Sequence, residues 1–507
     1  MPDLQVRLDR SAGGLADQLA AELRTAVRSG RLAAGGRLPA TRELARDLGT
    51  SRGVVVEAYQ QLVAEGFLTS RQGSGTRVAP MAPPGAGAPA LTPGPVGSGV
   101  PVGSGVPVGT VPGLVGSAGV PVGAVAPGLA GSAVAPGLAT SGVAYDLRVG
   151  TPDLAAFPRR AWLAAVRRVL TELPHQALGY GDPGGAPELR AELAAYLRRV
   201  RAADVTAERL VVVNGVAQGL HLTVGALARA GPIRLAVEDP HSARTYDLLE
   251  DAGAVPVPVP VDHEGIDVGA LRRTSARAVL VTPAHQYPTG VVLSPRRRAE
   301  LIAWAEEADG FVLEDDYDAE FRYDRNPVGC LQGLCPHRVV LLGSVSKSLA
   351  PGLRLGWLVA PPSLAGTVRH GRALSDLGSP VIDQHTMVQL IVSGAYDRHL
   401  RQMRRRYRAR RDALTAALSR WLPAAVPHGV PAGIQLYLEL PDGLDEAAVV
   451  AAAAARGLAI EGVAPLRIET PGPPALVLGF ARLPEHRAPG AARLLAAAVA
   501  AVQGERG

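Results

Sequence analysis

The stretch Ser344-Val-Ser-Lys347-Ser-Leu-Ala-Pro-Gly-Leu-Arg354-Leu-Gly-Trp357 follows the apolar run Val339-Val-Leu-Leu342. A lysine among small and hydroxylated residues just after a buried strand, with an arginine seven positions further on, suits a covalent amine beside an anion site. Most loop lysines are simply solvated. This stretch alone therefore leaves a solvated Lys347 and a reactive Lys347 both open.

A second stretch, Phe311-Val-Leu-Glu-Asp-Asp-Tyr-Asp-Ala-Glu-Phe-Arg-Tyr323, runs from a short apolar strand straight into a cluster of carboxylates. Like charges this close are costly unless a cation or a protonated ring nitrogen lies among them. A pyridinium supplies such a proton. The two stretches together therefore favour a reactive lysine beside a ring-bearing cofactor.

These two stretches resemble the aminotransferase-like domain of the MocR subgroup of GntR transcriptional regulators, whose fold (aminotransferase class I, PLP fold type I) binds pyridoxal 5'-phosphate (PLP). The resemblance implies that Lys347 carries the internal aldimine and that Asp315 pairs with the pyridine nitrogen. It also implies that Tyr317 hydrogen-bonds the ring hydroxyl and that Ser344 and Arg354 hold the phosphate.

Composition limits the class of protein. A chain of 507 residues with 47% hydrophobic content is expected to form two or more domains. The net charge of +6 permits a polyanionic partner without requiring one. Cys330 and Cys335 without further ligands are far below a metal signature, so no metal is expected. Two cysteines, no leader peptide and no long apolar segment predict a cytoplasmic protein without a membrane partner.

Residues 1–79 are predicted to form a winged helix-turn-helix. Apolar residues at helical spacing from Leu15, a second helix over 41–48 and a third helix capped by Ser51 precede a glycine-turned hairpin over 67–78. This module resembles the GntR family, whose Leu38-Pro-Ala-Thr-Arg42 and Ser51-Arg52 signatures are present. The expected partner is a double-stranded DNA operator.

In a winged helix-turn-helix the third helix enters the major groove and the wing lies along the backbone or minor groove. Arg42 and Arg52 start the second and third helices and are the first candidates for DNA contacts. Arg71 and Arg77 flank the wing turn. Each of these arginines taken alone also fits a solvated surface charge. The family usually has a polar pair where this chain has Gly53-Val54, so the operator or the affinity is expected to differ.

Residues 80–143 are predicted to be a disordered linker, because they contain almost only Gly, Pro, Ala, Val and Ser and cannot bury a core that offsets chain entropy. Weak, irregular packing on the large domain is the alternative.

Residues 144–507 are predicted to form the α/β aminotransferase-like effector domain. Its apolar strands alternate with helices, which indicates a mostly parallel sheet with the cofactor beyond the carboxyl ends of the strands. The strand-to-helix turn at Gly215, Val216 and Ala217 is a phosphate-loop candidate that donates main-chain N–H groups. In the family a tyrosine at the place of Tyr180 reaches a neighbour's phosphate across a dimer interface, so a homodimer is expected; a packed turn tyrosine is the alternative.

Further candidates follow from the family pattern. His241 stands where relatives stack an aromatic on the pyridine ring, and Arg244 is a candidate for a ligand carboxylate. Tyr287 replaces an asparagine that contacts the ring hydroxyl in true aminotransferases, which favours a sensor over a fast transaminase.

A smaller α+β subdomain is expected over about 385–507. The arginine-rich stretch 398–412 is interpreted as a helix with a solvated basic face rather than a DNA site. The arginine that binds a substrate carboxylate in ordinary aminotransferases is replaced around Leu478-Gly479, and Arg467 is a candidate replacement.

We therefore predict a PLP-dependent transcriptional regulator that senses PLP or an amino acid aldimine, with PdxR-like control of vitamin B6 synthesis or GabR-like amino acid response as models. A working aminotransferase with a DNA-binding appendage is the alternative. A cofactor-free repressor that keeps only the fold is a third possibility.

Overall fold

The structure is a computed structural model, and it describes residues 6, 8–10, 14–71, 75–79, 143–323 and 328–504. The predicted linker, apart from Val143, and the turn of the predicted wing at 72–74 lie outside the described residues. No helix in the described part of the chain has the length and apolar character that a membrane span needs.

The N-terminal module has the predicted order of three helices and a hairpin. Its elements are α1 (Leu15–Arg28), α2 (Thr41–Asp47), α3 (Arg52–Glu65), β1 (Leu68–Arg71) and β2 (Gly75–Val78). The helical spacing of apolar residues places Leu19, Leu23 and Leu62 in a fully buried core. The predicted helices are confirmed, with α2 ending one residue earlier than expected.

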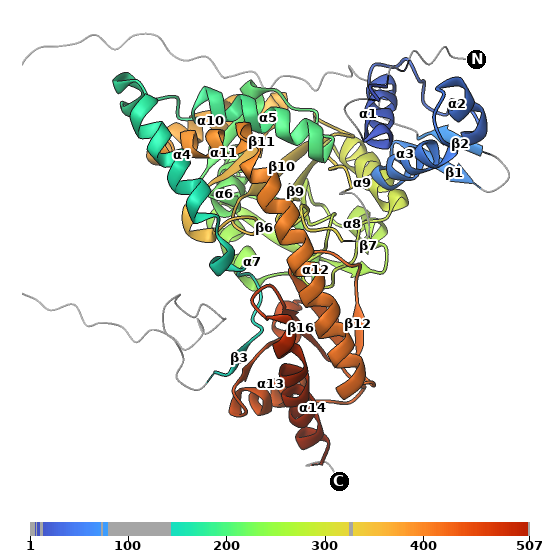
Figure 1. The fold of residues 1–507 in the computed structure, drawn as a ribbon, viewed down its shortest axis with the longest axis vertical. Helices are drawn as coiled ribbons and strands as arrows, with labels where there is room; N and C mark the ends of the chain where they lie inside the picture. The colour runs from blue at the N-terminus through green and yellow to red at the C-terminus, as the bar shows by residue number, and fades with distance from the viewer. Residues whose placement is uncertain are drawn as a thin grey trace, which may run out of the picture. The chain divides into compact units, whose positions relative to one another are not determined.

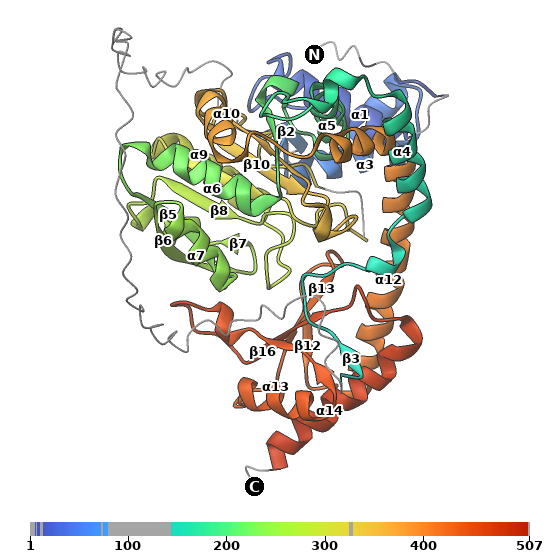
Figure 2. The same cartoon turned by 90° about the vertical axis from the view of Figure 1, so that its left-hand side faces the viewer.

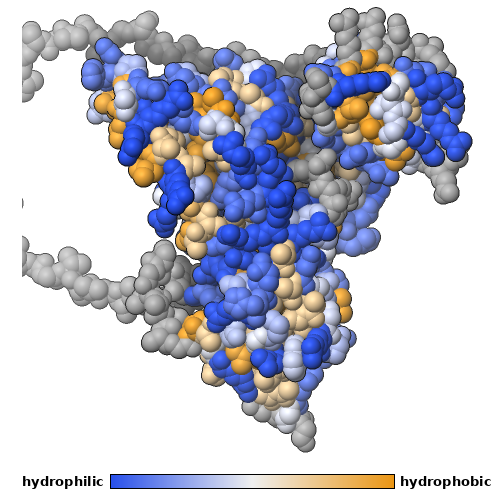
Figure 3. Space-filling model, in the orientation of Figure 1, coloured by the Kyte–Doolittle hydropathy of each residue, from blue (hydrophilic) through white to orange (hydrophobic). Residues whose placement is uncertain are grey.

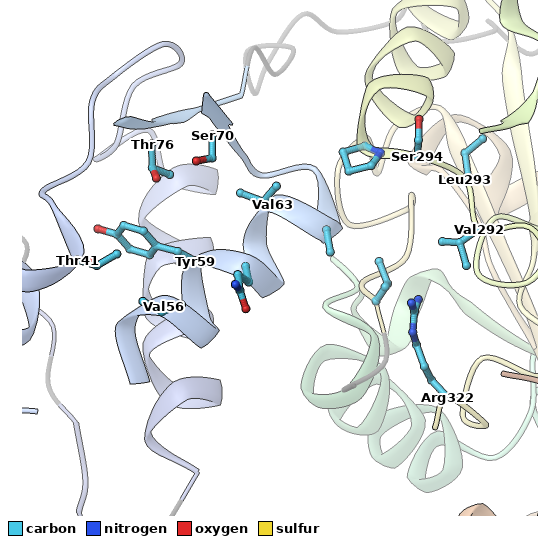
Figure 4. A pocket seen from close by; sticks show the side chains of 14 residues that line it. Thr41, Val56, Tyr59, Val63, Ser70, Thr76, Val292, Leu293, Ser294 and Arg322 are labelled. Carbon is cyan, nitrogen blue, oxygen red and sulfur yellow. The ribbon is translucent and has the colours of Figure 1, made fainter. Parts of the chain in front are cut away.

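Local contacts define the ends of the third helix. The Oγ of Ser51 accepts the N–H of Val54 at 3.4 Å and caps α3, and Gly66 ends it with a φ of 87°, a conformation that glycine adopts without strain. Ser70 and Thr76, which oppose each other in the antiparallel register, lie side by side on the hairpin (Figure 4). The hairpin therefore follows directly on the third helix, in the order of a winged helix-turn-helix.

The large domain is built on an eight-stranded sheet in the order β4-β11-β10-β9-β8-β5-β6-β7. The strands β10, β9, β8, β5 and β6 run parallel, and β4, β11 and β7 join antiparallel to their neighbours. The bounds are β4 (Leu210–Val213), β5 (Ile233–Asp239), β6 (Ala254–Asp262), β7 (Gly265–Ile266), β8 (Ala278–Val281), β9 (Phe311–Asp315), β10 (Val339–Ser344) and β11 (Gly356–Val359).

Helices cover both faces of this sheet, so apolar side chains on both faces of its central strands are buried. On β9 the side chain of Leu313 joins the core under α6, α7 and α10, and that of Val312 joins the core under α8 and α9. Figure 2 shows α6 and α7 together in front of the strands. The helices of this domain are α4 (Arg159–Glu172), α5 (Pro187–Arg201), α6 (Val216–Leu227), α7 (Ala243–Asp251), α8 (Val268–Arg273), α9 (Pro295–Glu307), α10 (Pro362–Asp376) and α11 (Val381–Val392).

The helix α12 (Ala395–Trp421) connects the large domain to the smaller one (Figure 1). Its visible face is hydrophilic (Figure 3), as the arginine-rich sequence predicts. Two of its arginines are structural, because Arg406 and Arg410 both pair with the buried Asp153 at 3.1 and 3.0 Å. The solvated-face interpretation of this stretch therefore holds in part, and an anchoring role is added to it.

The smaller domain has a four-stranded sheet in the order β12-β13-β16-β15. The strands predicted at 433–439 and 475–481 appear as β13 (Gln435–Glu439) and β16 (Ala475–Gly479). The sequence did not reveal that β3 (Tyr145–Asp146) pairs with β14 (Leu458–Ala459). The other elements are β12 (Val426–His428), β15 (Glu461–Gly462), α13 (Glu446–Ala455) and α14 (Ala488–Gly504).

Candidate functional site

A cavity of about 250 Å³ lies at the carboxyl ends of the parallel strands, where ligands bind in open α/β sheets. β9 ends at Asp315 and β10 ends at Ser344, and both residues line it. The described lining residues are Gly150, Val216, His241, Ser242, Thr245, Thr282, Tyr287, Asp315, Tyr317, Ser344, Ser346, Lys347 and Gln435. The topology thus brings together residues that are up to 285 positions apart in the chain.

Lys347 is the only lysine in the chain, so every other basic side chain among the 52 lysines and arginines is an arginine. Its Nζ donates to the carbonyl oxygen of Gly150 at 2.6 Å. Burial lowers the pKa of Lys347, while the charges of Asp318 and Asp315 oppose that shift. A lowered pKa increases the fraction of neutral amine, which is the nucleophilic form.

Three carboxylates in and just after β9 have partners among the described residues. Glu314 accepts two backbone N–H groups at 2.9 and 3.0 Å. Asp316 is bound by the guanidinium of Arg201 at 2.7 and 2.6 Å, and Asp318 lies 2.9 Å from Nδ1 of His285. Protein groups therefore supply the cations and hydrogen-bond donors for these three carboxylates. Of the carboxylates at this strand end, Asp315 is the one left for a ring nitrogen to pair with.

Asp315 differs from these neighbours. Its Oδ1 is buried and has no hydrogen-bond partner among the described residues. Burial and, to a smaller extent, the charge of Asp316 raise the pKa of Asp315 to about 7, and Lys347 opposes both. A buried acceptor without a donor costs free energy, and a protonated ring nitrogen is a donor that would satisfy it. This orphaned oxygen fits the pyridine nitrogen of PLP.

Hydrogen bonds to two other residues, His285 and Gln435, hold Tyr317 in place. Its hydroxyl donates to the carbonyl oxygen of His285 at 3.0 Å and accepts the Nε2 amide of Gln435 at 2.7 Å. The ring of Tyr287 stands edge-on to it with centroids 6.4 Å apart. The phenol is thus oriented in the cavity wall by one strand of the smaller domain and one loop of the larger domain.

The first turn of α6 supplies main-chain donors. Gly215 precedes the helix with a φ of 96°, and Val216 begins it and lines the cavity. The N–H groups of a helix's first turn have no hydrogen-bond partner within the helix and lie at the positive end of its dipole. This helix end therefore suits an anion. Ala217 follows in the same turn and is not among the described lining residues.

Two serines and one arginine lie near the start of α6. Ser344 is 6% exposed and lines the cavity together with Ser346. Arg354, at a φ of 48°, donates to the carbonyl oxygen of Asn214. A Cβ on Gly215 would come within 2.8 Å of the Arg354 guanidinium. The glycine therefore allows the arginine to approach the helix start, although Arg354 is not among the described lining residues.

His241 is 5% exposed and lines the cavity. Burial lowers its pKa to about 4, so the imidazole is neutral near pH 7. Its Nδ1 has no hydrogen-bond partner among the described residues, and its ring stands edge-on to Tyr287 at a centroid distance of 6.2 Å. A neutral, flat ring facing the cavity suits contact with a cofactor ring.

Three predicted residues lie away from the cavity lining. Tyr180 is 95% exposed, and Arg244 is exposed at the start of α7. Arg467 donates to the hydroxyl of Tyr437 at 3.2 Å and to the carbonyl oxygen of Pro473 at 2.7 Å. None of the described lining residues is an arginine. The carboxylate roles of the two arginines and the intersubunit role of Tyr180 stay predictions.

The DNA-contact candidates lie on the winged module. Arg42 and Arg52 are exposed in the first turns of α2 and α3. Arg77 is exposed on β2 and donates to the carbonyl oxygen of Gly35 at 3.0 Å. Arg71 is the last residue of β1. Their contacts with DNA stay predictions.

The sequence interpretation missed some lining residues. Thr282 directly follows β8, a position at which a polar residue signals the carboxyl edge. Its hydroxyl donates to Glu238 at 2.6 Å, and burial raises the pKa of Glu238 to about 7. Gln435 comes from the smaller domain and had no such signal. The other missed lining residues are Gly150, Ser242, Thr245 and Ser346.

Comparisons with known proteins agree with both parts of the chain. Residues 145–484 match the family of class I and II aminotransferases, and residues 15–78 match the gntR family of bacterial regulatory proteins. Among solved structures, the multiple substrate aminotransferase of Thermococcus profundus is 26% identical with a TM-score of 0.67, covering 72% of this chain and 93% of that one. LysN, the α-aminoadipate aminotransferase of Thermus thermophilus complexed with N-(5'-phosphopyridoxyl)-L-leucine, is 26% identical with a TM-score of 0.65, covering 72% and 94%.

Curated relatives share both parts. The probable rhizopine catabolism regulatory protein MocR of Rhizobium meliloti is 33% identical over 422 residues, covering 81% of this chain and 78% of that protein. The pyridoxine biosynthesis transcriptional regulator PdxR of Corynebacterium glutamicum is 33% identical over 414 residues, covering 81% and 80%. The chain belongs to the MocR subfamily of GntR-family transcriptional regulators.

Proposed function

We propose that this transcriptional regulator binds PLP covalently through Lys347 and that the bound cofactor changes how its winged module binds operator DNA. The observation that carries the proposal is the position of the single lysine. The chain has one lysine among its 52 lysines and arginines, and this one primary amine of a side chain lies in the cavity at the strand ends.

Lysine and arginine differ in the chemistry that matters here. PLP supplies an aldehyde, which condenses with a primary amine with loss of water. A guanidinium keeps its proton at any physiological pH and cannot act as that amine. The hydrogen bond from Nζ to the Gly150 carbonyl at 2.6 Å holds the amine at a fixed place in the cavity. Lys347 is thus the side chain that can make the bond.

The surrounding residues would hold the cofactor at three points. The free Oδ1 of Asp315 would accept a ring N–H, and the hydroxyl of Tyr317 would face the ring's own hydroxyl. The N–H groups of Val216 and Ala217, with Ser344 and Arg354, would hold the phosphate at the start of α6. Asp315, Tyr317, Val216 and Ser344 line the cavity, and the roles of Ala217 and Arg354 rest on their positions at the start of α6.

The effector is proposed to be PLP itself rather than an amino acid. An enzyme that turns over amino acids needs a positive group for the substrate carboxylate, and the described lining residues include no arginine. The name of the PdxR relative refers to pyridoxine biosynthesis, which is consistent with this choice. An amino acid bound to the cofactor is the second candidate, and transamination is the less supported alternative.

A homodimer is part of the proposal. Leu163 and Leu170 on α4 are each 61% exposed, Leu178 is 56% exposed and Tyr180 is 95% exposed. Hydrophobic residues lie around α4 on the face seen in Figure 3. Large apolar side chains left exposed at a surface favour an interaction site there, and a second copy of the chain would cover them while bringing a partner's tyrosine to each cavity.

The test compares DNA binding of the full-length protein with and without PLP. Sheared genomic DNA is bound to cofactor-free protein and to PLP-loaded protein, and the retained fragments are sequenced and their affinities measured by anisotropy. A ligand shifts DNA binding only if it binds two conformations unequally, so we expect PLP to change the affinity for the retained fragments in the wild type alone.

Lys347→Arg is the matched control, because it keeps a positive charge but provides no amine. We expect its DNA affinity to equal that of the cofactor-free wild type whether PLP is added or not. A Lys347→Arg protein that responds to PLP as the wild type does would refute covalent sensing. Wild-type DNA binding that ignores PLP would refute the sensor role and leave the amino acid candidate to be tested in the same assay.

A further inference from the structure

A second group of reactive side chains lies near the amino end of β10, opposite to the strand end that lines the cofactor cavity. Glu306 is in the last turn of α9, and Cys335 and His337 are in the loop that leads into β10. The Cys335 side chain is fully buried, while the side chains of Glu306 and His337 are each 31% exposed. A thiol inside and two polar ligands at the surface form a site that opens to solvent on one side.

The three ligand atoms converge. The Sγ of Cys335 lies 3.3 Å from Oε1 of Glu306 and 3.8 Å from Nε2 of His337. Nε2 of His337 and Oε1 of Glu306 are 2.6 Å apart. All three atoms fall within 4.8 Å of one another, so one ion placed among them would contact all of them.

These distances resemble those of a zinc site. With zinc bonds of about 2.3 Å to sulfur and about 2.0 Å to nitrogen and oxygen, tetrahedral geometry separates the ligand atoms by about 3.3 to 3.6 Å. The two sulfur distances lie close to that range. The nitrogen–oxygen pair, which shares a hydrogen bond, would open by about 0.7 Å on metal binding.

We propose that Cys335, His337 and Glu306 bind a single Zn²⁺ ion, with a water molecule in the fourth position. Thiolate and imidazole ligands select zinc over magnesium or calcium, and the carboxylate completes a ligand set known for zinc. Cys330 is not part of the site, because it lies in a different core cluster from Cys335. The ligand set is therefore not the Cys-x4-Cys pair that the sequence displays.

Binding must release a proton. Zinc binds cysteine as the thiolate, whereas the Cys335 Sγ lies 3.3 Å from the Glu306 carboxylate as a thiol donor in the metal-free protein. Zn²⁺ replaces that proton, which leaves to solvent, and His337 binds through Nε2 as the neutral tautomer that carries its hydrogen on Nδ1. The thiolate and the Glu306 carboxylate together neutralise the ion.

The charged groups next to Glu306 are compatible with a bound zinc ion. Arg338 lies 3.8 Å from the second carboxylate oxygen of Glu306, and its guanidinium is paired with Asp309 at 2.6 Å. Oε1 of Glu306 thus faces Cys335 and His337, while its second oxygen lies on the side of Arg338. Because one proton leaves when the metal binds, zinc affinity is expected to increase as pH rises.

This site is separate from the cofactor cavity. His337 lies just before β10, and Ser344 ends that strand, so the two sites are about 20 Å apart along its length. Zinc here would tie the end of α9 to the start of β10. Its expected role is to stabilise this edge of the large domain, since a ligand that binds only the folded state adds stability.

The experiment uses tag-free, full-length protein, stripped of metal with a chelator and titrated with Co²⁺ as a spectroscopic substitute for Zn²⁺. Tetrahedral Co²⁺ absorbs in the red, where PLP does not absorb, so the cofactor does not interfere. We expect one equivalent of Co²⁺ to give this band and one equivalent of Zn²⁺ to displace it. Competition with a chromogenic chelator then gives the zinc affinity.

Cys335→Ala and Cys330→Ala form the matched pair, since both remove a buried thiol. Cys335→Ala is expected to abolish the red band and to lower zinc affinity beyond the roughly 10–100-fold that loss of an outer-shell partner costs. Cys330→Ala is expected to bind as the wild type does. His337→Ala, which changes a partly exposed residue, checks the result in a protein whose metal-free thermal unfolding should match the wild type.

Two results would overturn the proposal. One is a band that survives in both Cys335→Ala and His337→Ala. The other is a weak, pale spectrum that needs several equivalents of Co²⁺, which indicates adventitious surface binding in octahedral geometry.

Discussion

The strand ends around Asp315 and the loop around Arg467 were both assigned to the ligand site by family resemblance, yet the structure surrounds them differently. Asp315 ends a buried strand, faces the cavity and keeps one oxygen without a partner among the described residues. Arg467 has its guanidinium committed to Tyr437 and Pro473. The strand ends that would hold the cofactor thus keep a free hydrogen-bond acceptor for a ligand. The arginine that would hold a substrate carboxylate is already bound to other protein groups.

The loop that carries Arg467 is also fixed at its base. The carboxylate of Asp239 accepts three consecutive backbone N–H groups of residues 468–470 at 3.0, 2.9 and 2.7 Å. Three such bonds to a buried charge resist rearrangement. To move into the cavity, Arg467 would have to break its hydrogen bonds to Tyr437 and Pro473 while Asp239 holds the following residues in place. The difference between the two regions therefore favours cofactor binding without efficient amino acid turnover.

The largest expected effect follows substitution of Lys347. Borohydride reduction of the PLP-loaded wild type should add one phosphopyridoxyl group, located on the peptide that contains residue 347 by mass spectrometry. Lys347→Ala and Lys347→Arg should both lose it completely, because no other side-chain amine exists in the chain. Any residual label on these variants would be confined to the chain's N-terminal amine. PLP-loaded wild type that gains no label on the peptide containing residue 347 would break the contrast between the two regions.

Asp315→Asn should have the next largest effect. The amide keeps the size of the side chain but cannot form a charge-assisted bond to a protonated ring nitrogen, which contributes about 1.5 to 3 kcal/mol. We expect PLP affinity, measured by equilibrium dialysis, to fall about 10- to 100-fold. Thr245→Val changes another lining residue and should alter the affinity less than about twofold. Equal losses in both variants would mean that the cavity wall, and not the carboxylate, sets the affinity.

The same carboxylate predicts a pH dependence of the cofactor-free protein. The pKa of Asp315 is about 7 in the folded state, against about 3.9 when unfolded. The folded state therefore binds its proton more tightly, and this group lowers the free energy of unfolding as pH rises from about 4 through 7. Asp315→Asn should match the wild type at pH 4 and exceed its stability by about 2 kcal/mol at pH 8, allowing for solvent in the cavity.

Denaturant unfolding at several pH values measures this difference. Glu238, whose pKa burial also raises to about 7, contributes a slope of its own that should remain in the variant. A gap between the two proteins that does not widen with pH would show that Asp315 ionises normally.

The sequence predicted that Lys347, Asp315 and Ser344 share one cavity, because these residues follow local rules, and their roles toward a cofactor stay predictions. Lys347, Asp315 and Ser344 each stand at or just after an apolar strand, and parallel strands bring their carboxyl ends together. A stronger signal was also present, because counting shows that Lys347 is the only lysine. Local pattern plus fold topology was enough to place these side chains in one cavity.

The residues that the sequence missed depend on distant contacts. Gln435 reaches Tyr317 from the smaller domain, 118 positions away, and β3 pairs with a strand more than 300 positions further on. The group of Glu306, Cys335 and His337 was missed because the helix end and the loop meet only in the folded chain. The spacing of residues along the sequence does not predict such long-range contacts.

The smallest expected effect concerns Arg467. Since its guanidinium is bound to Tyr437 and Pro473 and not to the cavity, Arg467→Ala should leave PLP affinity unchanged and should alter the response to added amino acids less than about twofold. The response is measured as the change in cofactor absorbance over a range of amino acid concentrations. Arg467→Lys keeps the charge and should behave identically. A large loss of amino acid response in Arg467→Ala that Arg467→Lys restores would show that the loop reaches the ligand after all, and the two regions would then act as one site.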